Sequence, residues 1–215
     1  MSTDATEPDA DNSPAARPQA SGVENADVEL GKKLASERDS PVVKAAAWAG
    51  EIGDQGPLYL LCAALFVAGL AARERRLAGS GISMLVAIGA ADLSKRLVKS
   101  FVRRSRPHVL LDEGDYKADT GGSEEKQEQS FPSGHTAGSG AAARALSRNF
   151  PAAGAAAGAA AVAIGISRVA KGAHWPLDVA AGAVIGLGAE ALSAMLLQFG
   201  WRSYCERARQ TRRRN

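Results

Sequence analysis

Five stretches of apolar residues follow a polar N-terminal segment, and charged residues separate each stretch from the next. All five are rich in alanine and glycine. None alternates apolar and polar positions as a half-buried strand does, and β-branched residues are sparse, so the pattern predicts a helix for each stretch. The stretches cover residues 55–72, 77–91, 132–146, 149–167 and 177–201.

These helices predict an all-α, membrane-embedded bundle of about five spanning helices. A spanning helix needs roughly 20 mostly apolar residues, and the stretches at 77–91 and 132–146 approach that length only marginally. Pairs of glycines four residues apart, such as Gly182 and Gly186, would let helix backbones approach closely. The mean hydropathy of −0.13 is compatible with membrane burial, because polar tails and a polar loop dilute the apolar runs.

Composition divides the chain into three parts. Residues 1–40 are acidic and rich in Ser, Pro and Ala, and they contain too little apolar surface to offset the entropy of ordering, so we expect a mostly disordered tail without a signal peptide. Residues 41–201 are predicted to form the membrane-embedded domain, in which 41–52 could lie in the membrane interface. Residues 202–215 form a basic C-terminal tail.

The basic residues predict the orientation of the bundle. Clusters of them follow the first, third and fifth stretches, at 73–76, 144–148 and 202–214. In a five-helix zigzag these clusters fall on one side, and positively charged loops face the cytoplasm. The acidic loop at 108–130 and the segment at 168–176 then lie on the opposite, outer side.

Polar residues suited to binding an anion gather at the helix ends on that outer side. The second apolar helix ends in "KSFVRRSRP", the third begins at "PSGH", and "SRVAKGAHWPLD" joins the fourth to the fifth. These segments lie far apart in the chain, but the zigzag brings them together. Eight of their residues are candidate site residues: Lys99, Arg106, Ser133, Gly134, His135, Arg168, His174 and Asp178.

Three of the candidates are cations, namely Lys99, Arg106 and Arg168. Clustered cations beside an apolar bundle are costly unless an anion joins them. The planar fork of arginine matches phosphate oxygens two at a time, and lysine adds a point charge. The cluster therefore predicts a phosphate site.

The segment "PSGH" predicts a helix start that would bind the same anion. Pro132 suits the first turn of a helix, and the N–H groups of Ser133, Gly134 and His135 would then point at the ligand. Gly134 lets the backbone approach the ligand closely because it has no side chain.

The two histidines in the motifs suggest a nucleophile and an acid. Pro176 indicates another helix start, which puts Asp178 one turn on and within reach of the imidazole of His174. A carboxylate that holds one ring nitrogen fixes the tautomer and leaves the other nitrogen free to attack. Two histidines beside a phosphate cradle make a nucleophile and an acid.

The three segments resemble the motifs of the type 2 phosphatidic acid phosphatase family, which also includes bacterial class A acid phosphatases and vanadium haloperoxidases. The family pattern is K-x6-RP, then PSGH, then SR-x5-H-x3-D. The sequence matches all eleven fixed positions, in order and with the correct internal spacing, over residues 99–178. The resemblance implies a bundle with a phosphatase/haloperoxidase-like core.

The resemblance also implies a role for each candidate residue. His174 would attack phosphorus and form a phosphohistidine, Asp178 would orient His174, and His135 would protonate the leaving oxygen. Such enzymes need no metal and no cofactor. The residues implied to bind the phosphoryl oxygens are Lys99, Arg106, Ser133, Gly134 and Arg168.

The expected function is hydrolysis of a lipid phosphate or diphosphate by an integral protein of a bacterial inner membrane, with an outward-facing active site. The expected partners are the lipid substrate and membrane lipids, and no nucleic acid. Two alternatives stay open. A vanadium-dependent haloperoxidase is disfavoured by the small chain, and a catalytically idle membrane interaction protein is disfavoured because every motif position is intact.

Three further polar residues are expected to have structural roles. Asp92 has Lys95 and Arg96 at helical neighbour spacing, which predicts an ion pair. Glu190 is expected to be a structural partner within the bundle. His108 fits no motif position and is predicted to be a loop residue near the mouth of the site.

Overall fold

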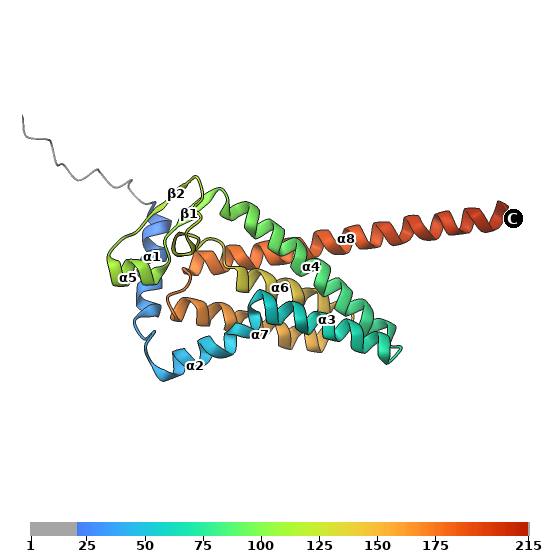
Figure 1. Ribbon diagram of the computed structural model, residues 1–215, viewed down its shortest axis with the longest axis horizontal. Coiled ribbons are helices and arrows are strands. Elements are labelled where there is room, and N and C mark those ends of the chain that lie inside the picture. The colour runs from blue at the N-terminus through green and yellow to red at the C-terminus, as the bar shows by residue number, and fades with distance from the viewer. Residues whose placement is uncertain (1–20, 215) are drawn as a thin grey trace, which may run out of the picture.

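The computed structural model describes residues 21–214, which are mostly helical and include one small two-stranded sheet (Figure 1). The elements are α1 (Gly22–Ala35), α2 (Pro41–Ala49), the 3-10 turn η1 (Gly50–Gly53), α3 (Gln55–Ala71), α4 (Arg75–Lys99), β1 (Val102–Arg104), α5 (Pro107–Glu113), β2 (Ala118–Thr120), the 3-10 turn η2 (Lys126–Glu128), α6 (Gly134–Ser147), α7 (Pro151–Ala170) and α8 (Pro176–Arg214).

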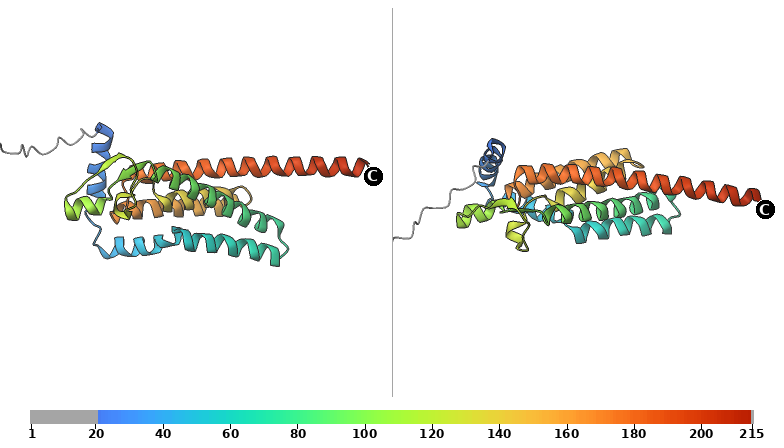
Figure 2. Two further views of the ribbon diagram at one scale, coloured as in Figure 1. Left: turned by 45° about the horizontal axis from the view of Figure 1, so that its top comes forward. Right: turned by 90° about the horizontal axis from the view of Figure 1, so that it is seen from above.

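The body of the molecule is a bundle of the five helices predicted from the apolar stretches. Helices α3, α4, α6, α7 and α8 run along its long axis, and α6 packs against α4, α7 and α8 (Figures 1 and 2). Small residues bring the backbones together: a Cβ atom at Gly186 would lie 2.3 Å from the carbonyl oxygen of Ala137. The core between α3, α4 and α6 contains Cys62, Met84 and Ile88.

Fewer helices reach spanning length than the five expected. Within residues 21–214, three helices are long and apolar enough to cross a membrane, namely α4, α7 and α8. A fourth span exists if α2–η1 and α3, which are bent by 52° at their junction, count as one. Helix α6 has 14 residues, which is about 21 Å at 1.5 Å per residue. The estimate of about five spans is therefore approximate.

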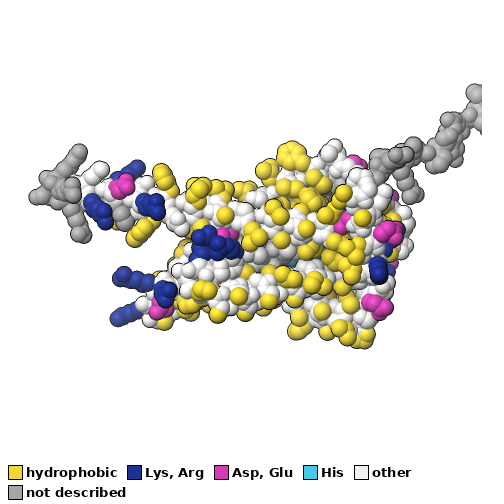
Figure 3. Space-filling view, turned by 180° about the vertical axis from the view of Figure 1, so that it is seen from behind, with side chains coloured by type: hydrophobic (Ala, Val, Ile, Leu, Met, Phe, Trp, Pro, Cys, Tyr) yellow, Lys and Arg dark blue, Asp and Glu magenta, His cyan; other side chains and the backbone are white. Residues whose placement is uncertain are grey.

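The two ends of the bundle differ in charge. The basic end contains the α3–α4 and α6–α7 turns and the C-terminal part of α8 (Figure 1). The acidic end contains α1, α5, β1 and β2 and the acidic loop at 108–130. Hydrophobic side chains cover much of the visible side of the bundle between these charged ends (Figure 3). The basic segments at 73–76, 144–148 and the end of α8 thus share one end, as the zigzag predicted.

The orientation of these ends in the membrane can be measured with single cysteines. In a background without Cys62 and Cys205, we expect a membrane-impermeant maleimide on intact cells to label Glu124→Cys, because Glu124 is exposed at the acidic end. Arg75→Cys, exposed at the basic end, should be labelled only after permeabilisation, since basic loops stay in the cytoplasm. The opposite pattern would reverse the orientation.

The N-terminal segment differs from its prediction. Residues 22–35 form α1, within the 1–40 segment that was expected to be mostly disordered; residues 1–20 of that segment lie outside the described residues. The hydroxyl of Ser21 caps the helix by accepting a hydrogen bond from the N–H of Glu24, and Asp27, Gly31 and Ala35 are buried. Composition misjudged this segment because the partners of its polar residues lie elsewhere in the chain.

The acidic loop at 108–130 contains regular secondary structure. It contains α5, η2 and β2, and β2 pairs with β1 in antiparallel register, Val102 opposite Thr120. Two of its acids pair closely with bases: Asp119 with Arg103 at 2.6 Å and Glu128 with Lys117 at 2.7 Å.

The predicted structural ion pairs are confirmed. Asp92 lies 2.8 Å from Lys95 and 2.9 Å from Arg96. Arg148, at the end of α6, donates two hydrogen bonds to the carboxylate of Glu190 on α8, from Nε to Oε1 and from Nη2 to Oε2 at 3.1 Å.

His108 differs from its prediction, because it lies in α5 rather than in a loop. Its Nδ1 atom is 3.2 Å from the carbonyl oxygen of Gly172.

Candidate active site

The structure brings the motif residues together at the acidic end of the bundle, each at or beside a helix terminus. Proline at the start of α5, α7 and α8 and caps such as Ser133 fix where these helices begin. Lys99 ends α4, Arg106 precedes α5, Ser133 caps α6, Gly134 and His135 begin α6, Arg168 lies in the last turn of α7, His174 lies between α7 and α8, and Asp178 lies in the first turn of α8.

The imidazole of His174 is buried and held by a backbone carbonyl. Its Nδ1 atom is 2.8 Å from the carbonyl oxygen of Ser130, an acceptor that requires Nδ1 to carry the proton. This tautomer leaves a lone pair on Nε2. The expected carboxylate partner is not the one that makes this bond, since Oδ2 of Asp178 lies 3.7 Å from Nδ1, beyond hydrogen-bond distance.

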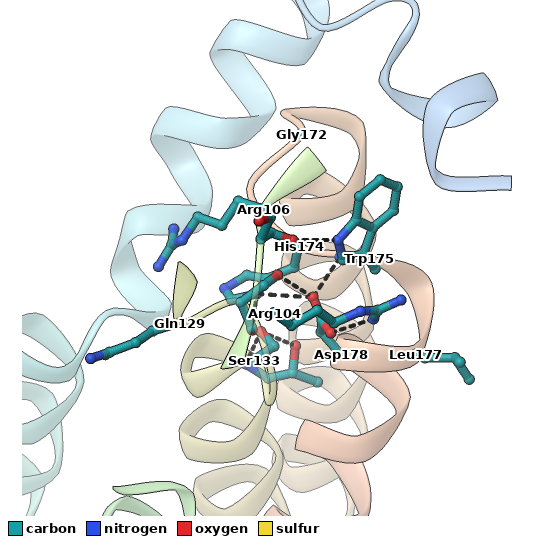
Figure 4. Close-up of polar contacts among 12 residues, drawn as sticks. Arg104, Arg106, Gln129, Ser133, Gly172, His174, Trp175, Leu177 and Asp178 are labelled. Atoms are coloured by element: carbon teal, nitrogen blue, oxygen red, sulfur yellow. Dashed lines mark hydrogen bonds and ion pairs between the residues drawn. The ribbon is translucent and has the colours of Figure 1, made fainter. Parts of the chain in front are cut away.

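Asp178 is fully buried (0% exposed) and sits at the centre of a hydrogen-bond web (Figure 4). Its Oδ1 atom accepts from Nη1 of Arg104 at 2.7 Å. Its Oδ2 atom accepts from the backbone N–H of Trp175 at 2.7 Å and from the hydroxyl of Ser130. Asp178 therefore holds the segment that bears His174 as well as facing the imidazole.

The surroundings of His174 keep its ring neutral. Burial lowers the pKa of the imidazole; Asp178 opposes this effect, and the positive charges of Arg106 and Lys99 lower the pKa further. A neutral imidazole at physiological pH is the form that can attack an electrophile. Lys99 and His174 bond the carbonyls of the adjacent residues Gln129 and Ser130, which places the ammonium and the imidazole on the same segment.

Lys99 and Arg106 are held by carbonyl groups of the segment that precedes α6. The ammonium of Lys99 donates to the carbonyl of Gln129, and Nε of Arg106 donates to the carbonyl of Lys126 at 2.9 Å. An ammonium has three donors and a guanidinium five, so both side chains keep donors for phosphoryl oxygens.

Arg168 is only 3% exposed, and a residue outside the motifs neutralises it. Its Nη1 atom lies 2.9 Å from Oε1 of Glu51, and Nη2 donates to the carbonyl of Ala47. Glu51 also lies 3.6 Å from Lys171 and 3.7 Å from Nε2 of His135. Sequence analysis missed Glu51, because nothing in the local sequence indicates a partner 117 residues away.

The start of α6 offers fewer free donors than predicted. The N–H of Ser133 donates to the carbonyl of Asp178 at 2.9 Å, so it is not available to a ligand. Gly134 and His135 occupy the first turn, where backbone N–H groups have no intrahelical acceptor. A Cβ atom at Gly134 would lie 2.9 Å from Nζ of Lys95, so this second lysine of α4 adds positive charge beside the helix start.

His135 has a ring nitrogen without a hydrogen-bond partner. Its Nε2 atom is buried and, among the residues that the structure describes, has no hydrogen bond. The carboxylates of Glu51 and Asp54 lie 3.7 and 3.8 Å away. Burial, with a smaller contribution from the charge of Arg168, lowers the pKa of the ring to about 4, and these carboxylates only partly oppose the shift. The ring is therefore neutral at physiological pH in the absence of a bound anion. The nitrogen is thus available to exchange a proton with a bound molecule.

A cavity between three helices of the bundle lies away from the motif residues. It has a volume of about 740 Å³, runs between α6, α7 and α8, and has a mostly apolar lining that includes none of the eight candidates. The clustered charges, rather than the cavity volume, therefore identify the candidate active site.

Sequence analysis missed Ser130 and Arg104, which contact the candidate residues His174 and Asp178 directly. Ser130 holds both His174 and Asp178, and Arg104 pairs with Asp178. Backbone pairing between Ser130 N–H and the carbonyl of Arg104, at 2.9 Å, fixes the two residues relative to each other. Arg104 lies in the spacer of K-x6-RP and Ser130 just before PSGH, so neither occupies a motif position.

A family model and two solved structures are similar to this chain. The family model described as the PAP2 superfamily matches residues 80–202. The crystal structure of Aquifex aeolicus LpxE is similar, with a TM-score of 0.61 and 25% identity, over 78% of this chain and 94% of that one. The crystal structure of the first transmembrane PAP2 type phosphatidylglycerolphosphate phosphatase from Bacillus subtilis has a TM-score of 0.62 and 23% identity, over 84% and 88%.

A search of curated proteins finds no match. The family model, however, spans more than half of the chain and includes all three motifs. The chain belongs to the PAP2 superfamily.

Proposed function

We propose that this protein is an integral-membrane phosphatase that hydrolyses a lipid phosphate or diphosphate through a phosphohistidine, without a metal ion. The observation that carries the proposal is the hydrogen bond of His174 Nδ1 to the carbonyl of Ser130, which leaves the lone pair on Nε2, while Lys99 bonds the carbonyl of the neighbouring Gln129. The apolar helices and the similarity to LpxE and to a phosphatidylglycerolphosphate phosphatase support a lipid substrate.

In the first step the Nε2 lone pair of His174 attacks phosphorus. An N–P bond forms while the bond from phosphorus to the lipid oxygen breaks. The bound phosphate anion favours the charged form of His135, so the ring, neutral in the free protein, takes up a proton when the substrate binds. It then gives its Nε2 proton to the leaving oxygen, so the lipid alcohol leaves uncharged. Asp178 lies 3.7 Å from Nδ1 and compensates the positive charge that His174 acquires.

In the second step water hydrolyses the phosphohistidine. His135, now neutral, accepts a proton from the water molecule as its oxygen attacks phosphorus. The N–P bond breaks, its electron pair returns to Nε2 of His174, and inorganic phosphate leaves. His135 keeps the proton, which restores the starting state of both histidines.

The charge of the transition state is met by protein groups. Lys99, Arg106 and Arg168 supply three cations, and the N–H groups of Gly134 and His135 at the start of α6 supply dipoles. Such preorganised donors are worth most in a site shielded from water. Arg168 reaches the phosphoryl group by exchanging part of its pairing with Glu51 for the substrate, since both are anionic.

A substrate panel tests the proposal. We expect the purified protein to release phosphate from phosphatidic acid, phosphatidylglycerol phosphate or a polyprenyl phosphate or diphosphate. Excess EDTA should leave the rate unchanged, because cationic side chains take the place of a metal clamp. Absence of phosphate release from every lipid would contradict the proposed reaction, and a loss on chelation that added Mg²⁺ restores would contradict metal independence.

A further inference from the structure

Helix α1 contributes a buried carboxylate to the region behind the active site. Asp27 is 5% exposed, and both of its oxygens are used. Oδ2 lies 2.6 Å from Nη2 of Arg104, and Oδ1 accepts the backbone N–H of Leu177 at 2.8 Å. Asp27 therefore binds Arg104 and also caps the start of α8, the helix that carries Asp178.

Arg104 connects α1 to the catalytic aspartate. Its Nη1 atom donates to Asp178 at 2.7 Å, Nη2 to Asp27 and Glu24, and Nε to the hydroxyl of Tyr116 at 3.2 Å. That hydroxyl donates in turn to Glu24. Each of the three guanidinium nitrogens thus has an acceptor, and two of the acceptor residues, Asp27 and Glu24, come from α1.

Close packing holds α1 in this position. Arg104 lies over the ring of Trp175, 5.5 Å from its centroid. Trp175 directly follows His174 in the chain and is fully buried. Gly31 of α1 faces the same ring: a Cβ atom there would lie 2.4 Å from Cε3 and 2.8 Å from Cζ3 of Trp175. Only glycine permits this approach of the helix to the ring.

We propose that α1 is a working part of the active site, in which Asp27 positions Arg104, and Arg104 fixes the place and the charge of Asp178 behind His174. This inference rests on the proposed function and assigns positioning roles to two residues outside the three motifs. Asp27 and Arg104 touch neither substrate nor phosphorus, and they act through Asp178.

The charges of Asp27, Arg104 and Asp178 explain how these buried residues influence His174. Burial lowers the pKa of Arg104, and the carboxylates of Asp178 and Asp27 more than offset this, so the guanidinium stays charged. One buried cation then lies between two buried carboxylates, which leaves one negative charge to balance the charge that His174 gains on phosphorylation. Removing one partner from such a network leaves an uncompensated buried charge.

The pH dependence of His174 follows from the charged and titratable groups around it. Those in the site are Asp178 of α8, Lys99 of α4, Arg106 before α5, His135 of α6 and Arg168 of α7, and those behind it are Arg104 of β1, Tyr116 before β2, and Asp27 and Glu24 of α1.

Two charge-removing substitutions should shift the pH profile in opposite directions. Asp27→Asn removes a negative charge, which disfavours the imidazolium, so the acidic limb of kcat/KM should move to lower pH. Arg104→Gln removes a positive charge, which favours the imidazolium, so the limb should move to higher pH. We expect shifts of about half a pH unit or more, since charges within a buried network interact strongly.

Both substitutions should lower kcat about tenfold with little change in KM, as loss of a residue that orients a catalytic group does. Arg104→Lys keeps the charge but cannot bridge all the partners, so it should lower kcat without moving the limb. Glu29→Gln is the matched control on α1, because within residues 21–214 Glu29 pairs only with Lys32, at an exposed position.

A displacement of α1 without any change of charge gives an independent test. Gly31→Ala should lower kcat several-fold, because its methyl group would collide with Trp175. Gly22→Ala on the same helix meets nothing within 4 Å and should leave kcat unchanged. Alanine favours helix over glycine at both positions, so a difference between them reports the contact with Trp175.

The inference would be overturned by wild-type kcat and an unshifted limb in Asp27→Asn, or by limbs that move in the same direction in Asp27→Asn and Arg104→Gln. If Arg104→Gln does not fold, two comparisons decide: Asp27→Asn against Glu29→Gln, and Gly31→Ala against Gly22→Ala. Failure of the proposed function looks different: the wild-type protein would then release no phosphate from a lipid, or His174→Asn would remain active.

Discussion

Replacing His174 by asparagine is expected to stop turnover while leaving the fold intact. The amide nitrogen of asparagine occupies the place of Nδ1 and can still donate to the carbonyl of Ser130, which His174 contacts at 2.8 Å. The nucleophilic Nε2 has no counterpart in asparagine, so no phosphoenzyme can form. We expect kcat to fall roughly 10⁴-fold or more, as it does when a covalent nucleophile is removed.

The measurement combines steady-state phosphate release with acid-quench trapping. Wild-type protein mixed with ³²P-labelled lipid phosphate should yield an acid-labile, base-stable phosphoprotein, and His174→Asn should yield none. His108→Gln is the control, because His108 is the one histidine of the sequence outside the motifs. Substantial turnover in His174→Asn would show that another group attacks phosphorus.

Replacing His135 by glutamine should have an effect that depends on the leaving group. Glutamine has no transferable proton, so hydrolysis of a lipid phosphate, whose alkoxide is a poor leaving group, should fall roughly 10²- to 10⁴-fold. With p-nitrophenyl phosphate the first step needs little protonation and should be nearly normal. The second step then becomes limiting, because no base activates water.

The predicted signature of His135→Gln is a burst. Mixing with p-nitrophenyl phosphate should release about one p-nitrophenol per enzyme at once, followed by slow turnover, and phosphoenzyme should accumulate. The wild-type protein should accumulate less phosphoenzyme under the same conditions, because its His135 activates water for the second step. Equal losses on both substrates, without a burst, would mean that His135 does not transfer the proton.

Much of the arrangement could be predicted from local sequence. Apolar stretches give helices, proline and small polar residues mark helix starts, and basic clusters give the zigzag that carries the motif segments to one end. The ion pair of Asp92 with Lys95 and Arg96 followed from helical spacing alone. The family assignment followed because the motif positions are fixed in order and spacing. All these features depend on residues close together in the chain.

Other features were wrong or approximate because their partners are distant in the chain. Asp178 was expected to hold His174 by a hydrogen bond, since one helical turn separates them, yet the carbonyl of Ser130, 44 residues away, is the group that bonds Nδ1. The N–H of Ser133 was expected to face a ligand, yet the carbonyl of Asp178 accepts it. Spacing places a residue near another, but it does not say which acceptor is better aligned.

The sequence by itself determined the helices, the motif residues and their common end of the bundle, because periodicity, helix-start residues and charge act over a few residues. Only the tertiary structure decided how α1 is used. In the sequence, Asp27 and Glu24 have no evident partner, which contributed to the prediction that residues 1–40 are disordered. In the structure they pair with Arg104, at sequence separations of 77 and 80 residues. A buried charge is tolerable only with its partner, and that partner is known only once the chain has folded.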